Sequence, residues 1–154
     1  METNTANRLT LRIERTFSAP RAAVYGALTN ADQLREWWGP KGFTTPGIDF
    51  DPQAGDSYRI AMQPPEGDAF YLSGEFHAVE PGGRFAFTFR WEPPDPDDRE
   101  TLATLVLEDV GLDTVVRLTQ GEFATEERLA LHREGWSESI DRLAELLAAF
   151  EGDT

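Results

Sequence analysis

Two histidines are the residues of this chain best suited to acid–base chemistry. His132 lies one helical turn before Trp136 on the apolar face of an expected helix. It can transfer a proton at the wall of a cavity, or it can be a core-edge histidine bonded to a backbone carbonyl or a water. No acidic partner is evident beside it, which favours the second interpretation. His77 alternates with Phe76 and Ala78, so we expect it to face solvent.

Acidic pairs are the other candidates for catalysis. Asp49 and Asp51 stand two residues apart on one face of an expected strand, and Glu75 and Glu80 fall near strand positions. Paired carboxyl groups can do general acid–base work when their surroundings separate their pKa values. The chain has 28 Asp and Glu residues, however, so such pairs arise by chance, and solvated strand faces explain them better. We therefore predict no catalytic residue, and an enzyme is the less favoured class.

The sequence also lacks the patterns of several other kinds of site. There is no cysteine, and the two histidines lie on different elements without a shared spacing, so we predict no metal. Glycine-rich phosphate loops and a nucleophile elbow are absent, and we predict no cofactor. The net charge of −14 would repel nucleic acids and anionic membranes, so we expect neither as a partner.

The length and hydropathy of the chain indicate how many domains it has and where in the cell it works. The 154 residues fit one domain with a sizeable core. No apolar run approaches the roughly 18 residues of a membrane span, and residues 1–8 lack the apolar core of a secretory signal. We therefore expect a cytoplasmic protein.

The element that carries His132 is an expected helix at 125–150. Its apolar positions, spaced by three or four residues, are Leu129, His132, Trp136, Ile140, Leu143, Leu147 and Phe150. Thr125 is the expected N-cap, and Gly152 is the expected C-terminal cap. A helix this long and this one-sided needs a large apolar partner surface.

Strands supply that surface. Alternating apolar residues between turn residues predict strands at 9–17, 46–50, 57–62, 70–78, 84–91, 102–107 and 115–118. Two short helices, at 21–29 and 31–37, follow the first strand. Pro20 is expected at the first helical position of one, and Asn30 or Thr29 caps the other. This order predicts an α+β fold, an antiparallel sheet wrapped on a helix, with an exposed loop at 92–100.

Several local motifs occur in a particular order along the chain. They are RTFSAP at 15–20, WWGPKGF at 37–43, Gly55, VEP at 79–81 followed by RF at 84–85, and HREGW at 132–136. Together they resemble the activator of heat-shock protein 90 ATPase homologue-like branch of the SRPBCC (START-like, birch-pollen-allergen-like) superfamily. The similarity extends over residues 9–150.

The resemblance implies a helix-grip fold. In it, a curved antiparallel sheet of six to seven strands is wrapped on the long C-terminal helix, with the small helices closing one end of a cavity between helix and sheet. It implies a single domain at 9–150, flanked by a flexible N-terminus at 1–8 and a tail at 151–154. The family shares no catalytic triad, metal or cofactor, and it includes ligand binders, cyclase-like enzymes and co-chaperone domains. Function must therefore be argued from the site.

Aromatic residues would line such a cavity. An ordinary core takes most aromatic side chains, but one helix on a curved sheet often leaves space, and an aromatic pocket with few polar groups is typical of a small-molecule site. The predicted ligand-binding residues are Trp37, Phe43, Tyr58, Met62, Phe76, Phe87, Phe89, Trp91, His132, Trp136 and Ile140. We expect Phe70, Leu72, Leu105 and Leu107 to complete the wall.

Two further features bear on the cavity. Trp37 and Trp38 are adjacent and cannot share one helix face, so one is expected to pack inward and the other to cover the mouth. The segment 37–43 is then a gate or partner-contact loop, or else a structural plug. Gly135 inside the long helix costs about 1 kcal/mol relative to alanine, which a close contact with the sheet or the tryptophans would explain.

These observations give three functional hypotheses. The first is non-catalytic binding of a small hydrophobic or aromatic ligand. The second is a protein-interaction module, chaperone-cofactor-like or part of a stress response, that uses the acidic surface and the segment 37–43. The third and weakest is a cyclase- or hydrolase-like enzyme that uses His132. A homodimer is a further open alternative.

Overall fold

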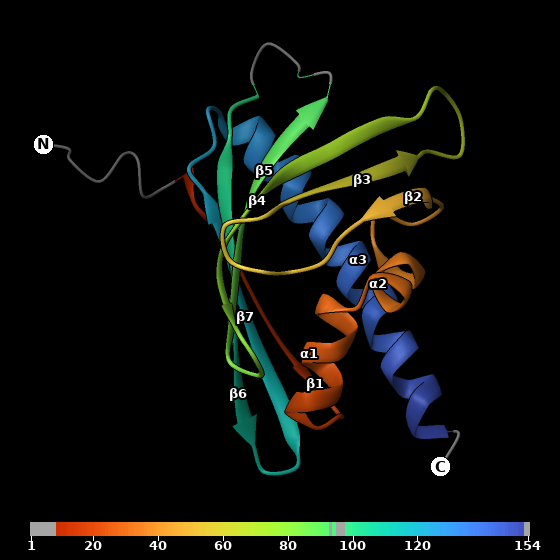
Figure 1. Cartoon of the computed structure of the whole chain (residues 1–154), viewed down its shortest axis with the longest axis vertical. Coiled ribbons are helices and arrows are strands. Elements are labelled where there is room, and N and C mark those ends of the chain that lie inside the picture. The colour runs from red at the N-terminus through yellow and green to blue at the C-terminus, as the bar shows by residue number, and fades with distance from the viewer. Residues whose placement is uncertain (1–8, 93, 95–97, 153–154) are drawn as a thin grey trace, which may run out of the picture.

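A computed structural model of the chain describes residues 9–92, 94 and 98–152 (Figure 1). The elements follow the order β1 (Leu11–Phe17), α1 (Arg21–Thr29), α2 (Ala31–Trp37), β2 (Thr44–Asp49), β3 (Ser57–Gln63), β4 (Phe70–Glu80), β5 (Arg84–Glu92), β6 (Thr101–Val110), β7 (Asp113–Gly121) and α3 (Glu126–Gly152). The α+β class and the two short helices after the first strand are confirmed. The flexible N-terminus predicted at 1–8 lies outside the described residues.

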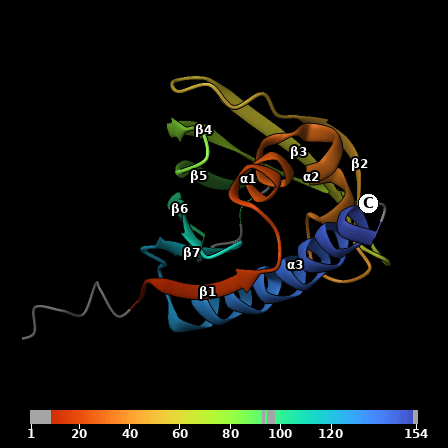
Figure 2. The same cartoon turned by 90° about the horizontal axis from the view of Figure 1, so that it is seen from below.

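All seven strands belong to one antiparallel sheet with the order β1-β7-β6-β5-β4-β3-β2. Strands β2 to β6 are each paired with the next strand along the chain, and β1 pairs with β7, from Leu11 opposite Gln120 to Phe17 opposite Thr114. The sheet curves around α3, with α1 and α2 beside the same helix (Figures 1 and 2). This arrangement is the expected helix-grip fold.

The long helix α3 forms because one of its faces is apolar and its start is capped. The Thr125 hydroxyl accepts a hydrogen bond from the backbone N–H of Arg128 at 3.1 Å, as an N-cap does. Trp136, Ile140 and Leu143 are buried, and so is Leu147 one turn further on. With 27 residues the helix is about 40 Å long.

The ends of several elements differ from the sequence prediction. The helix α3 continues to Gly152, so residues 151 and 152 are helical and Gly152 is not a cap beyond the helix end. Strands β6 and β7 extend to Val110 and Asp113, which face each other at the turn, because main-chain pairing continues through the exposed residues 108–110 at the end of β6. Pro20 is the N-cap of α1, with an extended backbone, rather than its first helical residue.

An aromatic core fills the concave face beneath α1. Its rings are those of Phe50, Tyr58, Phe76, Phe85 and Phe87, with neighbouring centroids 4.9 to 6.5 Å apart. Tyr25 of α1 contacts the edge of Phe85 at 6.3 Å. The Tyr58 hydroxyl donates a hydrogen bond to the carbonyl of Thr88 at 2.5 Å. Burial raises the pKa of Tyr58 well above its usual value, so this phenol stays neutral.

Gly74 lets β4 lie unusually close to β5. A Cβ atom at this position would stand 1.9 Å from the carbonyl oxygen of Thr88 and 2.8 Å from its Oγ1. The same Oγ1 accepts a hydrogen bond from the backbone N–H of Glu75 at 2.8 Å. The strand therefore requires a residue without a side chain here because of the close approach.

Within the described part of the chain, no helix has both the length and the apolar character needed to cross a membrane.

Candidate functional site

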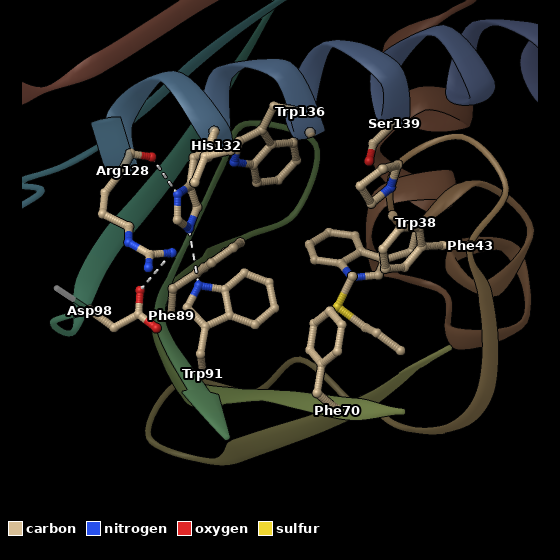
Figure 3. A pocket seen from close by; sticks show the side chains of 15 residues that line it. Trp38, Phe43, Phe70, Phe89, Trp91, Asp98, Arg128, His132, Trp136 and Ser139 are labelled. Carbon is tan, nitrogen blue, oxygen red and sulfur yellow. Dashed lines mark hydrogen bonds and ion pairs between the residues drawn. The ribbon is translucent and has the colours of Figure 1, made fainter. Parts of the chain in front are cut away.

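A pocket of about 400 Å³ lies between α3, strands β3 to β5 and the segment that follows α2 (Figure 3). It is lined by Trp38, Gly39, Pro40, Phe43, Met62, Phe70, Phe89, Trp91, Asp98, Arg128, Leu131, His132, Gly135, Trp136 and Ser139. The helix contributes positions spaced by three or four residues, which is one face of its first half. Aromatic rings from both the sheet and the helix form most of the remaining wall.

Trp136 forms part of the buried end of the pocket and is held in place by a buried polar network. Its indole Nε1 donates a hydrogen bond to Gln120 Oε1 at 2.6 Å, and Gln120 Nε2 donates to Thr101 Oγ1 at 2.8 Å. The side chain of Gln120 is fully buried. The Trp136 ring meets the Trp38 ring edge to face, with centroids 5.4 Å apart. These contacts fix the orientation of both rings.

Both ring nitrogens of His132 form hydrogen bonds with other residues of the pocket wall, so neither is free to contact a ligand. Its Nε2 accepts a hydrogen bond from Trp91 Nε1 at 3.0 Å, and its Nδ1 lies 2.8 Å from the carbonyl oxygen of Arg128. Because Nε2 accepts, the proton of the neutral ring belongs on Nδ1, where it is donated to that carbonyl. Burial lowers the pKa of His132, and the backbone bond to Arg128 opposes this only in part. The backbone-bonded interpretation of His132 is thus the one the structure supports.

The lowered pKa of His132 predicts a pH dependence of stability. The unfolded chain takes up a proton near pH 6.5 while the folded chain does not, so the free energy of unfolding should fall as the pH drops below this value. The fall should be smaller in His132→Gln, as measured by urea unfolding at about pH 7.5 and about pH 5.5. His77→Gln replaces the other histidine, at an exposed position, and serves as the control variant. Equal slopes in His132→Gln and the wild type would contradict the prediction.

An ion pair lies at the rim of the pocket. Arg128 of α3 and Asp98, from the segment before β6, approach to 3.6 Å between Nη1 and Oδ1. Asp98 is 8% exposed and Arg128 is 21% exposed, so the pair is largely shielded. Leu131 stands beside it with 52% of its surface exposed, which makes the rim partly apolar.

Arg142 holds the segment that forms the opposite wall. Its Nη1 donates hydrogen bonds to the carbonyl oxygens of Trp38 and Gly39, both at 3.0 Å, and of Pro40 at 3.3 Å. Its Nη2 donates to the carbonyl oxygen of Glu36 at 3.2 Å. One guanidinium therefore satisfies carbonyl groups at and beyond the C-terminus of α2, where positive charge is favourable.

A second contact joins the same segment to α3. The backbone N–H of Lys41 donates to Glu138 Oε1 at 2.8 Å. The segment after α2 is thus attached to the long helix by both a cation and an anion.

Six of the predicted ligand-binding residues line the pocket: Phe43, Met62, Phe89, Trp91, His132 and Trp136. Phe70, which was expected in the wall, also lines it, whereas Leu72, Leu105 and Leu107 are core residues outside it.

The other predicted residues lie elsewhere. Tyr58, Phe76 and Phe87 belong to the aromatic core beneath α1, because strand alternation predicts a face but not a position along it. Ile140 is buried beyond the end of the pocket. Trp37 donates its Nε1 to the carbonyl oxygen of Ala27 at 2.8 Å and packs inward.

Several lining residues were not predicted. Trp38 lines the pocket, whereas the sequence analysis predicted that Trp37 would. Arg128, Leu131, Gly135 and Ser139 follow one another at steps of three or four residues, so they could have been found by continuing the helical spacing along the face that carries His132 and Trp136. No sequence pattern indicates that Asp98 lines the pocket, or that Arg142 donates hydrogen bonds to the segment after α2. We call this set of hydrogen bonds from Arg142 the clamp.

Gly135 makes no close contact with the sheet. A Cβ atom here would have Pro40 Cγ, at 3.8 Å, as its nearest atom beyond the helix and its chain neighbours, and that distance is an ordinary contact. The expected steric reason for glycine is therefore wrong, and the missing side chain instead leaves room in the pocket wall. The acidic residues Asp49, Asp51, Glu75 and Glu80 do not line the pocket. Among the described residues, no three metal-ligating side chains converge.

Solved structures of several bacterial proteins share this architecture. The AHSA1 protein from Silicibacter pomeroyi is 30% identical, with a TM-score of 0.81 over 91% of this chain and 98% of that one. A protein from Rhodobacter sphaeroides is 27% identical, with a TM-score of 0.77 over 92% of this chain and 93% of that one. A protein from Chromobacterium violaceum, at 24% identity, shares the fold with a TM-score of 0.81 over 91% and 97% of the two chains. No protein of curated function matches the chain.

A family match covers most of the sequence. The family described as Activator of Hsp90 ATPase homolog 1-like protein matches residues 18–148. This range contains both short helices, strands β2 to β7 and most of α3. The protein therefore belongs to the Activator of Hsp90 ATPase homolog 1-like family, as its motifs predict.

Proposed function

We propose that this protein binds a small hydrophobic or aromatic molecule in the pocket between α3 and strands β3 to β5, without catalysing a reaction. The observation that carries the proposal is the pocket itself. A volume of about 400 Å³ with mostly aromatic walls is within the range of small-molecule sites.

The rigidity of the walls supports binding. Trp136 is fixed through Gln120, Trp91 is bonded to His132, and Arg142 holds the segment after α2. Because these side chains are already ordered, a ligand would not have to immobilise them, and less of its interaction energy would be lost on binding.

The hydrogen bonds and the ion pair between residues of the pocket wall argue against a catalytic role for the pocket. Both nitrogens of His132 are engaged by the protein, and the lowered pKa keeps the ring neutral. Asp98 and Arg128 are paired with each other at the rim. A general acid or base needs a group within reach of the substrate and free to exchange a proton, and His132 does not fit that description.

The family name points to a chaperone as an alternative partner. In that hypothesis the segment 37–43 would form the contact. Its two tryptophans are only 1% and 5% exposed, and its backbone is bonded to Arg142 and Glu138. Since its large apolar side chains face inward, the small-molecule hypothesis has the stronger support.

Filling the pocket from Gly135 tests the proposal. We expect the wild type to bind N-phenyl-1-naphthylamine, a neutral dye that fluoresces in apolar surroundings; a neutral probe avoids repulsion by the net charge of −14. Gly135→Leu should weaken binding by about tenfold or more, which corresponds to about 1.4 kcal/mol of lost apolar contact. Fluorescence titration measures the dissociation constant of each variant.

Gly135→Ala is the matched control at the same position. Its methyl group fits against Pro40, so binding should change little. Its unfolding temperature should rise, because alanine is favoured over glycine in a helix by about 1 kcal/mol. The proposal fails if the dye does not bind the wild type, or if it binds Gly135→Leu as tightly as Gly135→Ala.

A further inference from the structure

The polar atoms of the pocket wall are nearly all used by the protein itself. Trp136 donates to Gln120, Trp91 donates to His132, and His132 bonds to the carbonyl of Arg128. A ligand therefore cannot be recognised by these groups without breaking an internal bond, which would leave a buried polar atom unpaired.

The hydroxyl of Ser139 is an exception. Ser139 lies at the buried end of the pocket beside Trp136, and the residue is only 5% exposed. Its hydroxyl makes no hydrogen bond to any other described residue, not even to the backbone carbonyl of Gly135 four residues earlier, which a helical serine often uses. Figure 3 shows its hydroxyl on the pocket side of α3. A hydroxyl in such surroundings gains from any partner that a ligand brings.

Apolar side chains form most of the wall of the pocket that this hydroxyl faces. Trp38, Phe89 and Trp136 are each at most 5% exposed and contact one another, with ring centroids 5.4 to 6.1 Å apart. Flat rings complement such walls, whereas a second polar group on the ligand would be buried against carbon. The Nε1 of Trp38 also lacks a hydrogen-bond partner in the described part of the chain, but the atom itself is fully buried and is not open to a ligand in the pocket.

We propose that the ligand has an apolar, ring-shaped body with a single hydrogen-bonding group, a hydroxyl or a carbonyl, and that the Ser139 hydroxyl binds this group at the buried end of the pocket. The inference rests on the proposed binding function and narrows it to a class of ligand. Ser139 then orients the ligand with its polar group inward and its apolar body toward Leu131 at the rim.

A pair of ligands of equal shape tests the role of Ser139. In 2-naphthol and 2-methylnaphthalene a hydroxyl and a methyl group occupy the same place, so the ratio of their dissociation constants isolates the hydrogen bond. Equilibrium dialysis measures both constants for each variant. Ser139→Ala should reduce the preference for 2-naphthol over 2-methylnaphthalene by about fivefold relative to the wild type.

Ser137→Ala is the matched control. Ser137 is exposed on the same helix two residues earlier, so its removal should leave the ratio unchanged. A ratio that does not change in Ser139→Ala, or that changes equally in Ser137→Ala, overturns the role of Ser139 while the binding function stands. If neither naphthalene nor the fluorescent dye binds the wild type, the binding function itself is overturned, and the inference with it.

Discussion

Replacing Gly74 by alanine is expected to lower the free energy of unfolding by about 3 kcal/mol or more. The added methyl carbon would stand 1.9 Å from the carbonyl oxygen of Thr88 on the neighbouring strand, which no side-chain rotation can relieve. Strands β4 and β5 would have to separate. That movement would strain the hydrogen bonds that Thr88 accepts from Tyr58 and from the backbone of Glu75.

Urea unfolding followed by circular dichroism measures this effect. Gly26→Ala is the control, because no atom beyond its neighbours lies within 4 Å of a Cβ there and it lies inside α1. It should stabilise the protein by up to about 1 kcal/mol. A Gly74→Ala variant as stable as the wild type would show that β4 and β5 are not packed this closely in solution.

Replacing Arg142 by alanine is expected to cost about 2 kcal/mol and to weaken binding of the fluorescent dye by about tenfold. The substitution removes the cation that bonds the carbonyl groups of Glu36, Trp38, Gly39 and Pro40. The segment after α2 would then lose its attachment to the long helix at that point. Because this segment forms a wall of the pocket, both stability and binding should fall together.

Arg133→Ala separates this effect from a general loss of charge on α3. Arg133 is exposed, and its side chain donates a hydrogen bond of 3.2 Å to the carbonyl oxygen of Arg12, so we expect a change below about 0.5 kcal/mol in the free energy of unfolding and no change in dye binding. Arg142→Lys should recover only part of the loss, since an ammonium cannot reproduce the planar fork of the guanidinium. Equal effects of Arg142→Ala and Arg133→Ala would contradict the clamp.

The fold could be predicted well because its elements have regular periods. The three- and four-residue spacing predicts α3, and the strict alternation from Phe85 to Trp91 predicts β5. The pattern of apolar residues did not predict where the strands and helices end. The β6–β7 hairpin continues to Val110 and Asp113 through main-chain pairing, which leaves no apolar pattern to detect.

The candidate site could be predicted only in part, because a pocket depends on contacts between distant segments. Alternation placed both Phe87 and Phe89 on the concave face, but only Phe89 lines the pocket. Nothing in the sequence near His132 shows that Trp91 donates to it from another element. The choice between Trp37 and Trp38 depended on the path of the chain after α2, where the distant Arg142 donates to the carbonyl oxygen of Trp38.

The attachment of the segment after α2 to Arg142 also has a consequence for how the protein is made. The bonded residues are separated by 102 to 106 positions in the chain, and β1 likewise pairs with β7 across a comparable distance. Contacts of such long range form slowly and late. During synthesis, the strands that precede α3 expose their apolar concave face until residue 142 has left the ribosome, and such a surface is prone to aggregation. The walls of the pocket are therefore among the last parts of the molecule to be completed.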